Sequence, residues 1–180
     1  GADKTNPTVF TEFDSIMEKN NSKCRLLEGY GLTETVTVVV VNRIFDRKPS
    51  SVGKPFPDVK LKVIDENGNT LGTNQNGQIC ISAPCLALGY LNDKEATDKT
   101  FVTDENGIRW VLTGDEGYID EDGFLFIKGR IKDMFKIAGF NIFPADIEDM
   151  TNKIEGVENC AAVYIDNPNH PYVHLFIKSD

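Results

Sequence analysis

The segment Trp110–Arg130 (WVLTGDEGYIDEDGFLFIKGR) constrains the fold most strongly. It contains two stretches rich in aromatic and β-branched residues, separated by the turn-forming residues 120–123. This pattern predicts two strands joined by a turn. After Arg130 the pattern changes, because a further strand and loop at 133–143 lead to a helix that opens at Pro144, a favoured first helical position. The change predicts a domain boundary near Arg130.

The other elements are predicted from hydrophobic periodicity and from turn residues. We expect a helix at 9–20, a second helix at 93–100 capped by Asn92 or Asp93, a loop at 47–58, a turn at 66–69, and strands at 25–27, 59–65, 77–82, 160–166 and 172–178. The predicted fold class is therefore α+β, mostly β up to Arg130 and then β-α-β-β. We place the domains at residues 1–130 and 131–180.

The charge balance argues against one class of partner. Lys and Arg total 19 against 28 Asp and Glu, a formal net charge of −9. A nucleic-acid polymer requires a basic face on the protein, so we expect no such partner. A nucleotide ligand remains possible, because local groups and a bound cation can hold phosphates in an acidic protein.

Apolar runs and cysteines carry further information about the class of protein. No apolar run approaches the roughly 20 residues needed to span a bilayer, and the N-terminal residues lack a signal-peptide pattern. We therefore expect a cytoplasmic protein without a transmembrane segment. Cys24, Cys80, Cys85 and Cys160 have no zinc-ligand spacing, and we expect them to be buried, reduced thiols.

Four short clusters stand out, namely EGYGLTET (28–35), GQICIS with GYLN (77–92), LTGDEGYID (112–120) and GRIKDMFKIAGFNIFPADIE (129–148). The first leads into the apolar tract VTVVVV, whose valines we assign to the core. Any one cluster alone can be an ordinary turn, loop cap or solvated connector. Together, in this order, they resemble the acyl-adenylate-forming superfamily, which includes acyl-CoA synthetases, aryl-CoA ligases such as 4-coumarate ligase, firefly luciferase and peptide-synthetase adenylation domains.

The resemblance implies a fold and a set of nucleotide-binding residues. The chain would form the rear part of the large adenylating domain and the first half of a small, mobile C-terminal domain. In the first cluster, Tyr30 between Gly29 and Gly31 would lie against adenine. Thr33 would donate its hydroxyl to the α-phosphate, and Glu34 would hold Mg²⁺, a cation that prefers carboxylate oxygen.

Further nucleotide contacts follow from the same resemblance. Asp115 would accept both ribose hydroxyls, since a carboxylate has two acceptor oxygens. Arg130 would reach the ribose from the other side. Gly1 and Ala2 match the family's Gly-Ala loop beside adenine.

The resemblance also implies a second half-reaction that depends on domain rotation. Lys132 would be the hinge about which the small domain turns to bring the loop 136–140 to the active site. Gly139 and Phe140 would lie on the CoA side, with glycine leaving room for the pantetheine arm. Lys136 matches a lysine linked to thioester formation. Without this context, Lys132 and Lys136 would be ordinary exposed cations on a strand.

The implied function is that of an ATP-dependent acyl-CoA ligase of fatty acid metabolism. It would convert a carboxylic acid to acyl-AMP with ATP and Mg²⁺ and transfer the acyl group to CoA. Leu32 favours this branch, because amino-acid-activating relatives usually carry proline there. The family's phosphate loop and its adenylation lysine are absent, so we expect an internal-to-C-terminal fragment that lacks upstream and downstream parts and is inactive alone.

Two alternatives remain open. The parent protein could be an acyl-AMP ligase that loads a carrier protein, or the chain could be a non-catalytic nucleotide-binding or scaffold module. The identity of the acid cannot be predicted from these residues.

Overall fold

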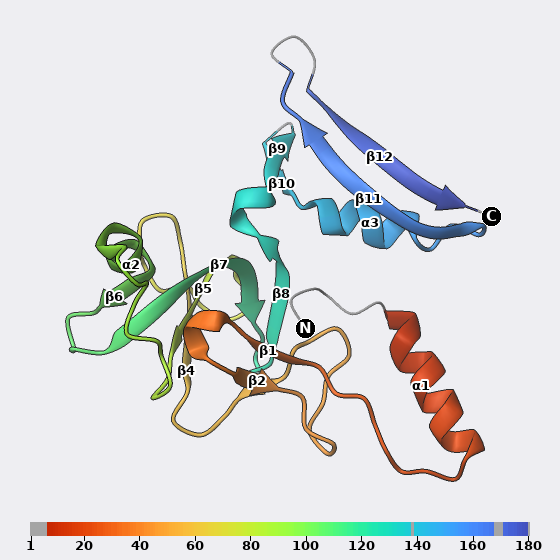
Figure 1. Ribbon diagram of the computed structural model, residues 1–180, viewed down its shortest axis with the longest axis horizontal. Coiled ribbons are helices and arrows are strands. Elements are labelled where there is room, and N and C mark those ends of the chain that lie inside the picture. The colour runs from red at the N-terminus through yellow and green to blue at the C-terminus, as the bar shows by residue number, and fades with distance from the viewer. Residues whose placement is uncertain (1–6, 138, 168–170, 180) are drawn as a thin grey trace. The chain divides into compact units, whose positions relative to one another are not determined.

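The computed structural model describes residues 7–137, 139–167 and 171–179 (Figure 1). It divides into two compact units, one comprising Gly1–Thr113 and Gly117–Ile127 and the other Gly114–Glu116 and Lys128–Asp180. Strands β7 (Arg109–Ile119) and β8 (Leu125–Arg130) contribute residues to both. The domain boundary at residue 130 stays a prediction, and the two units are described in turn.

The first unit contains two sheets and two helices. Helix α1 (Pro7–Lys19) precedes an antiparallel sheet of order β1-β2-β3, formed by Gly29–Gly31, Val38–Val41 and Lys54–Pro55. The second sheet has the order β4-β5-β7-β6, with β8 beside β7; β4 is Lys60–Ile64, β5 is Gly77–Ser82 and β6 is Phe101–Thr103. Helix α2 (Lys94–Thr100) precedes β6, and the Asp93 side chain caps it by accepting from the N–H of Ala96, as predicted.

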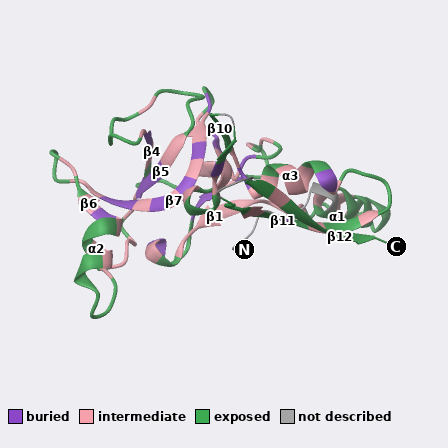
Figure 2. Ribbon diagram, turned by 90° about the horizontal axis from the view of Figure 1, so that it is seen from above, coloured by how far each residue is buried: buried purple, intermediate pink, exposed green. Residues whose placement is uncertain are grey.

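The core of this unit joins both sheets. Val39 and Val40 of β2 are buried with Ile79, Ile81, Phe101, Val111 and Leu125 of the second sheet. Figure 2 shows buried stretches of β5 and β7 in purple. Full burial of one such side chain contributes about 1.5–3 kcal/mol. Backbone bonds link the sheets as well, since the N–H of Leu125 donates to the Gly53 carbonyl at 2.9 Å.

The second unit is built on two antiparallel strand pairs around helix α3 (Pro144–Thr151). A 3-10 turn, η2 (Ile131–Asp133), precedes the pair β9 (Phe135–Ile137) and β10 (Phe140–Ile142), and the pair β11 (Val157–Ile165) and β12 (Tyr172–Ser179) follows α3. The rings of Phe135 and Tyr164 stack at 4.4 Å. The Glu148 carboxylate ties α3 to β11 by accepting from the N–H of Ala162 at 2.8 Å.

The α+β class and most predicted elements are confirmed. The strand predicted at 25–27 is wrong, because pairing with β2 begins only at Gly29, which lies opposite Val41. Strand β3 lies within the predicted loop, since Lys54 and Pro55 extend the first sheet. The predicted strand and loop at 133–143 form two paired strands.

Two expectations about burial are wrong. Of the four cysteines expected to be buried, Cys80 is buried, Cys85 and Cys160 are half-buried, and Cys24 is exposed because it lies on the irregular segment between α1 and β1. Val36 and Val38 are also exposed, at 72% and 44%, since Val36 lies at the centre of a turn and Val38 is the first residue of β2, ahead of the buried Val39 and Val40.

Within the residues that the structure describes, none of the helices has the length and apolar character that crossing a bilayer requires.

Candidate functional site

The glycine-tyrosine cluster forms strand β1 at the edge of the first sheet. A side chain at Gly31 would place its Cβ 2.2 Å from the carbonyl oxygen of Thr37, so only glycine permits this approach of the two backbones. The ladder also shifts register between Tyr30 and Gly31. Tyr30 is half-buried and packs against the core. Backbone packing therefore accounts for Gly31, while the contact of Tyr30 with adenine stays a prediction.

The buried hydroxyl of Thr35 fixes the turn that follows. Thr33–Thr35 form a 3-10 turn, η1, and Thr35 is fully buried. Its Oγ1 accepts from the N–H of Leu32 at 2.8 Å and lies 2.9 and 2.8 Å from the carbonyl oxygens of Leu32 and Thr37. One hydroxyl proton serves these two acceptors. Sequence reasoning assigned Thr35 no role, although it lies within the TET motif.

A tight reversal at Val36 ends this turn. The N–H of Thr37 donates to the Thr35 carbonyl at 2.7 Å, a three-residue γ-turn centred on Val36 at φ 63° and ψ −32°. Positive φ is strained for a β-branched residue, at a cost of order 1–3 kcal/mol. The buried Thr35 and the exposed Val36 are thus consecutive residues of the same γ-turn.

Thr33 and Glu34 are presented by the same turn. Thr33 is exposed, and Glu34 is half-buried. The carbonyl of Glu34 accepts from the N–H of Ala87 at 2.8 Å, and its Oε1 accepts from the hydroxyl of Tyr90 at 2.5 Å. The bond to Glu34, together with partial burial, raises the pKa of Tyr90 above its ordinary value. Tyr90 belongs to the GYLN motif, but no sequence signal connected it to Glu34.

The donor set of this turn fits a magnesium ion bound together with a phosphate ligand. Glu34 offers carboxylate oxygen and Thr33 a hydroxyl, both hard oxygen ligands. Over the described ranges there is no group of three His, Cys, Asp or Glu side chains that could hold a metal by themselves. Protein Mg²⁺ sites commonly use one or two carboxylates plus substrate phosphates, so a single carboxylate suits such a site.

The structure brings together Asp115 and Arg130, both in the second unit. Asp115 lies in β7 with 7% of its side chain exposed, and its Oδ1 is 3.0 Å from Nε of Arg130, whose side chain is 48% exposed. Gly114, at φ 71°, leaves room beside the guanidinium. The pair presents a carboxylate and a cation from adjacent strands, a combination suited to hydroxyl groups of a ligand.

The remaining predicted residues lie at different places. Lys132 is exposed in η2 and not on a strand, because Ile131–Asp133 form a 3-10 turn. Lys136 is exposed in β9 opposite Asn141, Gly139 has φ 86°, and Phe140 is 74% exposed in β10. Gly1 and Ala2 lie outside the described residues.

Comparison with known proteins identifies the family. Residues 1–91, half of the chain, match the family described as AMP-binding enzyme. The chain belongs to this family. This assignment confirms the resemblance derived from the four clusters.

Individual relatives agree with this family. The chain is 42% identical to a long-chain-fatty-acid–CoA ligase of Escherichia coli O157:H7, over 77% of this chain and 24% of the ligase. It is 36% identical to 4-coumarate–CoA ligase 1 of Glycine max, over 84% of this chain and 53% of that protein. Among solved structures, ATP-bound MatB from Rhodopseudomonas palustris aligns with a TM-score of 0.78 at 32% identity, covering 88% of this chain and 31% of that one.

The aligned region is only part of the bacterial ligase. The chain spans about a quarter of the length of the bacterial ligase it matches.

Proposed function

We propose that this chain is part of an ATP-dependent acyl-CoA ligase. A carboxylate oxygen of the acid attacks the α-phosphorus of ATP, the bond to the β-phosphate breaks, and pyrophosphate leaves. The thiol of CoA then attacks the acyl carbon, a thioester forms, its proton is released and AMP leaves. The similarity to two CoA ligases supports this reaction class, as does the ATP-bound relative among solved structures.

The observation that carries the proposal is the fixed turn η1. Thr35 is buried and holds the backbone on both sides of Thr33 and Glu34 through its hydroxyl. The two side chains are thereby presented with little freedom, and preorganised groups stabilise developing charge most effectively. Thr33 would donate to the α-phosphate and Glu34 would hold Mg²⁺. When bound, the ion would neutralise phosphate oxygens as pyrophosphate departs.

The other roles are part of the same proposal. Tyr30 would contact adenine, and Asp115 with Arg130 would bind the ribose. Rotation at Lys132 would bring Lys136 and its loop to the thioester-forming site, with CoA as the acceptor.

The proposal is tested in the full-length ligase that contains this chain. Pyrophosphate release is measured with ATP, Mg²⁺ and a panel of carboxylic acids. We expect Glu34→Gln to lower the rate by about 10²–10³-fold, the loss typical of one removed electrostatic group. Glu95→Gln is the matched control, because Glu95 lies on the exposed face of α2 paired with Lys99.

Three outcomes would contradict the proposal. If no acid supports pyrophosphate release, the chain serves a non-catalytic protein. If Glu34→Gln retains full activity, the role of the fixed turn is wrong. Acyl transfer is assayed separately with CoA and with a carrier protein, and transfer only to the carrier would exclude CoA as the acceptor.

A further inference from the structure

A loop far from Glu34 in the sequence contacts this residue twice. In the segment 87–93, the N–H of Ala87 donates to the Glu34 carbonyl at 2.8 Å, and the hydroxyl of Tyr90 donates to Glu34 Oε1 at 2.5 Å. Both contacts lie within the first unit. The backbone contact fixes the position of the loop relative to η1. The side-chain contact fixes one oxygen of the carboxylate.

The segment 87–93 is itself held by groups other than Glu34. The guanidinium of Arg109 donates to the carbonyls of Ala87 and Leu88 at 2.7 and 2.8 Å and lies 4.3 Å from the centre of the Phe101 ring. Two bonds to adjacent carbonyls use the planar fork of the guanidinium. Arg109 thus ties the start of the loop to β7, so the loop has support in addition to its contact with Glu34.

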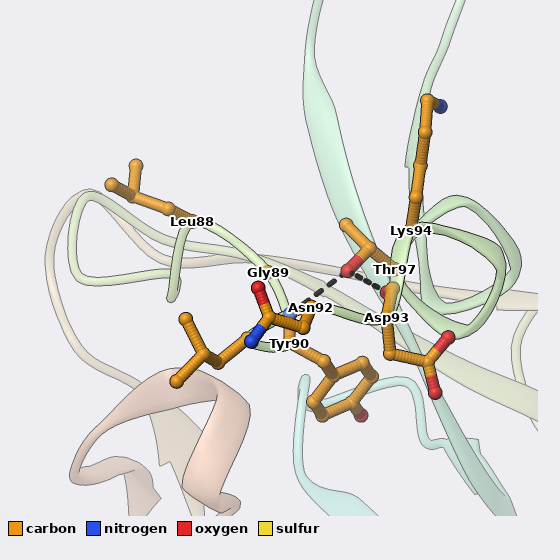
Figure 3. Close-up of a pocket in the computed structure, with 8 residues that line it drawn as sticks. Leu88, Gly89, Tyr90, Asn92, Asp93, Lys94 and Thr97 are labelled. Atoms are coloured by element: carbon orange, nitrogen blue, oxygen red, sulfur yellow. Dashed lines mark hydrogen bonds between the residues drawn. The ribbon is translucent and has the colours of Figure 1, made fainter.

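Tyr90 is fixed in the same way at its backbone and its ring. Its N–H donates to Oγ1 of Thr97 at 2.8 Å, and Oγ1 in turn donates to the Asp93 carbonyl at 2.7 Å (Figure 3). Its ring packs at 6.0 Å from that of Phe101, tilted by 56°. In Figure 3 the ring points to the side opposite the Lys94 side chain. The hydroxyl therefore reaches Glu34 from a support built by α2 and β6.

We propose that Tyr90 is a positioning residue that orients the Glu34 carboxylate for a divalent cation bound with ATP, an inference that rests on the role proposed for Glu34. The hydroxyl holds Oε1, and the carboxylate fixed in this way would supply oxygen to the cation. A glutamate side chain has several rotatable bonds, so one fixed oxygen reduces the number of orientations that compete with metal binding.

The chemistry of the partner supports this role. Lys or Arg at position 90 would pair with Glu34 and neutralise the charge that attracts a cation. A phenol donates a hydrogen bond and leaves the carboxylate ionised. A phenol has an ordinary pKa near 10, so it is protonated and can donate at neutral pH. Tyr90 thus orients the Glu34 carboxylate without neutralising its negative charge.

The test uses Tyr90→Phe in the full-length ligase. Because Tyr90 is 39% exposed, removing its hydroxyl is compatible with folding, and thermal melting verifies this. Equilibrium binding of Mn²⁺ in the presence of ATP is measured by electron paramagnetic resonance, and the Mg²⁺ dependence of pyrophosphate release is measured in parallel. We expect about tenfold weaker cation binding and a matching rise in the Mg²⁺ concentration for half-maximal rate, in line with losses of supporting partners at metal sites.

Tyr172→Phe is the matched control, since it removes a phenol hydroxyl from exposed strand β12, and we expect no change. Unchanged Mn²⁺ binding in Tyr90→Phe would overturn the inference, as would a rate loss that is equal at all Mg²⁺ concentrations.

The variant Glu34→Gln distinguishes a failure of the inference about Tyr90 from a failure of the proposed function. If Glu34→Gln loses cation binding and Tyr90→Phe does not, only the inference is wrong. If Glu34→Gln itself binds Mn²⁺ normally, the proposed role of Glu34 and the inference both fail. In the double variant we expect Tyr90→Phe to have no further effect on cation binding, because no carboxylate remains to be oriented. An additional loss there would contradict orientation as the mechanism.

Discussion

Replacing Thr35 with valine removes the hydroxyl that fixes η1 while nearly keeping the side-chain volume. The N–H of Leu32 then loses its 2.8 Å acceptor, whereas the Leu32 carbonyl still accepts from the N–H of Thr35 at 3.1 Å. The Thr37 carbonyl also loses the hydroxyl donor that lies 2.8 Å from it. The loss is therefore dominated by one unsatisfied, partly buried donor, whose cost lies within or below the range of about 1–3 kcal/mol for buried donors.

The effect of Thr35→Val is measured by thermal melting, which reports global stability, and by hydrogen exchange, which reports local stability. A loss of about 2 kcal/mol lowers the Tm by roughly 4–8 °C in a protein of this size. Because the chain contains two units, a single transition is not assured, and native-state hydrogen exchange at the Leu32 amide is the more direct assay. We expect Thr35→Val to speed exchange at Leu32.

Thr35→Ser provides the control for the lost hydroxyl. It keeps the hydroxyl and removes only a methyl group, so we expect Leu32 to stay protected with a stability loss of about 1 kcal/mol. If Leu32 exchanged equally fast in the wild type and in Thr35→Val, the hydroxyl would not fix the turn, and the argument from preorganisation would lose its basis.

Three further predictions concern other parts of the chain. In the full-length protein, the proposed ligase, Asp115→Ala should weaken binding of a non-hydrolysable acyl-adenylate, measured calorimetrically, by about 1.5–3 kcal/mol for each charge-assisted bond lost. Lys132→Pro should slow thioester formation more than adenylation in single-turnover assays, because proline disfavours the helical conformation of the preceding residue and so alters η2. The phenol of Tyr90 should titrate above its ordinary pKa in ultraviolet difference spectra, and Glu34→Gln should lower that pKa. Since the folded-state pKa is raised, the bond stabilises the fold below about pH 10 and is lost as pH rises through the folded pKa.

Each of these has a contradicting outcome. Unchanged affinity in Asp115→Ala would leave Asp115 only a structural partner of Arg130. Equal slowing of both half-reactions by Lys132→Pro would contradict the hinge assignment. An identical Tyr90 titration with and without the Glu34 carboxylate would mean that the contact is absent in solution.

Regular elements were predictable where local signals agree. The segment 59–65 alternates and is followed by an Asn-Gly turn, and Asp93 provides a capping side chain before α2, so β4 and α2 followed from the sequence. The segment 25–27 has a strand-like composition, but strand formation depends on a partner. The first sheet pairs at Gly29 and leaves that segment irregular. Such competition between long-range partners has no local signal.

The candidate site was predictable only in part. Thr33 and Glu34 were identified through a motif, and the pairing of Asp115 with Arg130 was not, since their proximity depends on the alignment of β7 with β8. The contact between Tyr90 and Glu34 joins residues 56 positions apart. A single sequence carries no information on such a contact, because it arises from how α2 and β6 support the loop.

The γ-turn at Val36 has a consequence for how this chain tolerates change. Before the turn lie Thr33 and Glu34, the proposed ligand-binding pair. After it lie Val39 and Val40, which pack in the core. Since the reversal takes only three residues, inserting or deleting one residue between Glu34 and Val39 would slip the pairing of β2 and turn its side chains to the opposite face. Glycine at position 36 would relieve the positive φ but would also loosen the backbone beside Glu34. At position 36, glycine therefore has the lower backbone strain, whereas valine restricts the backbone of the turn more strongly.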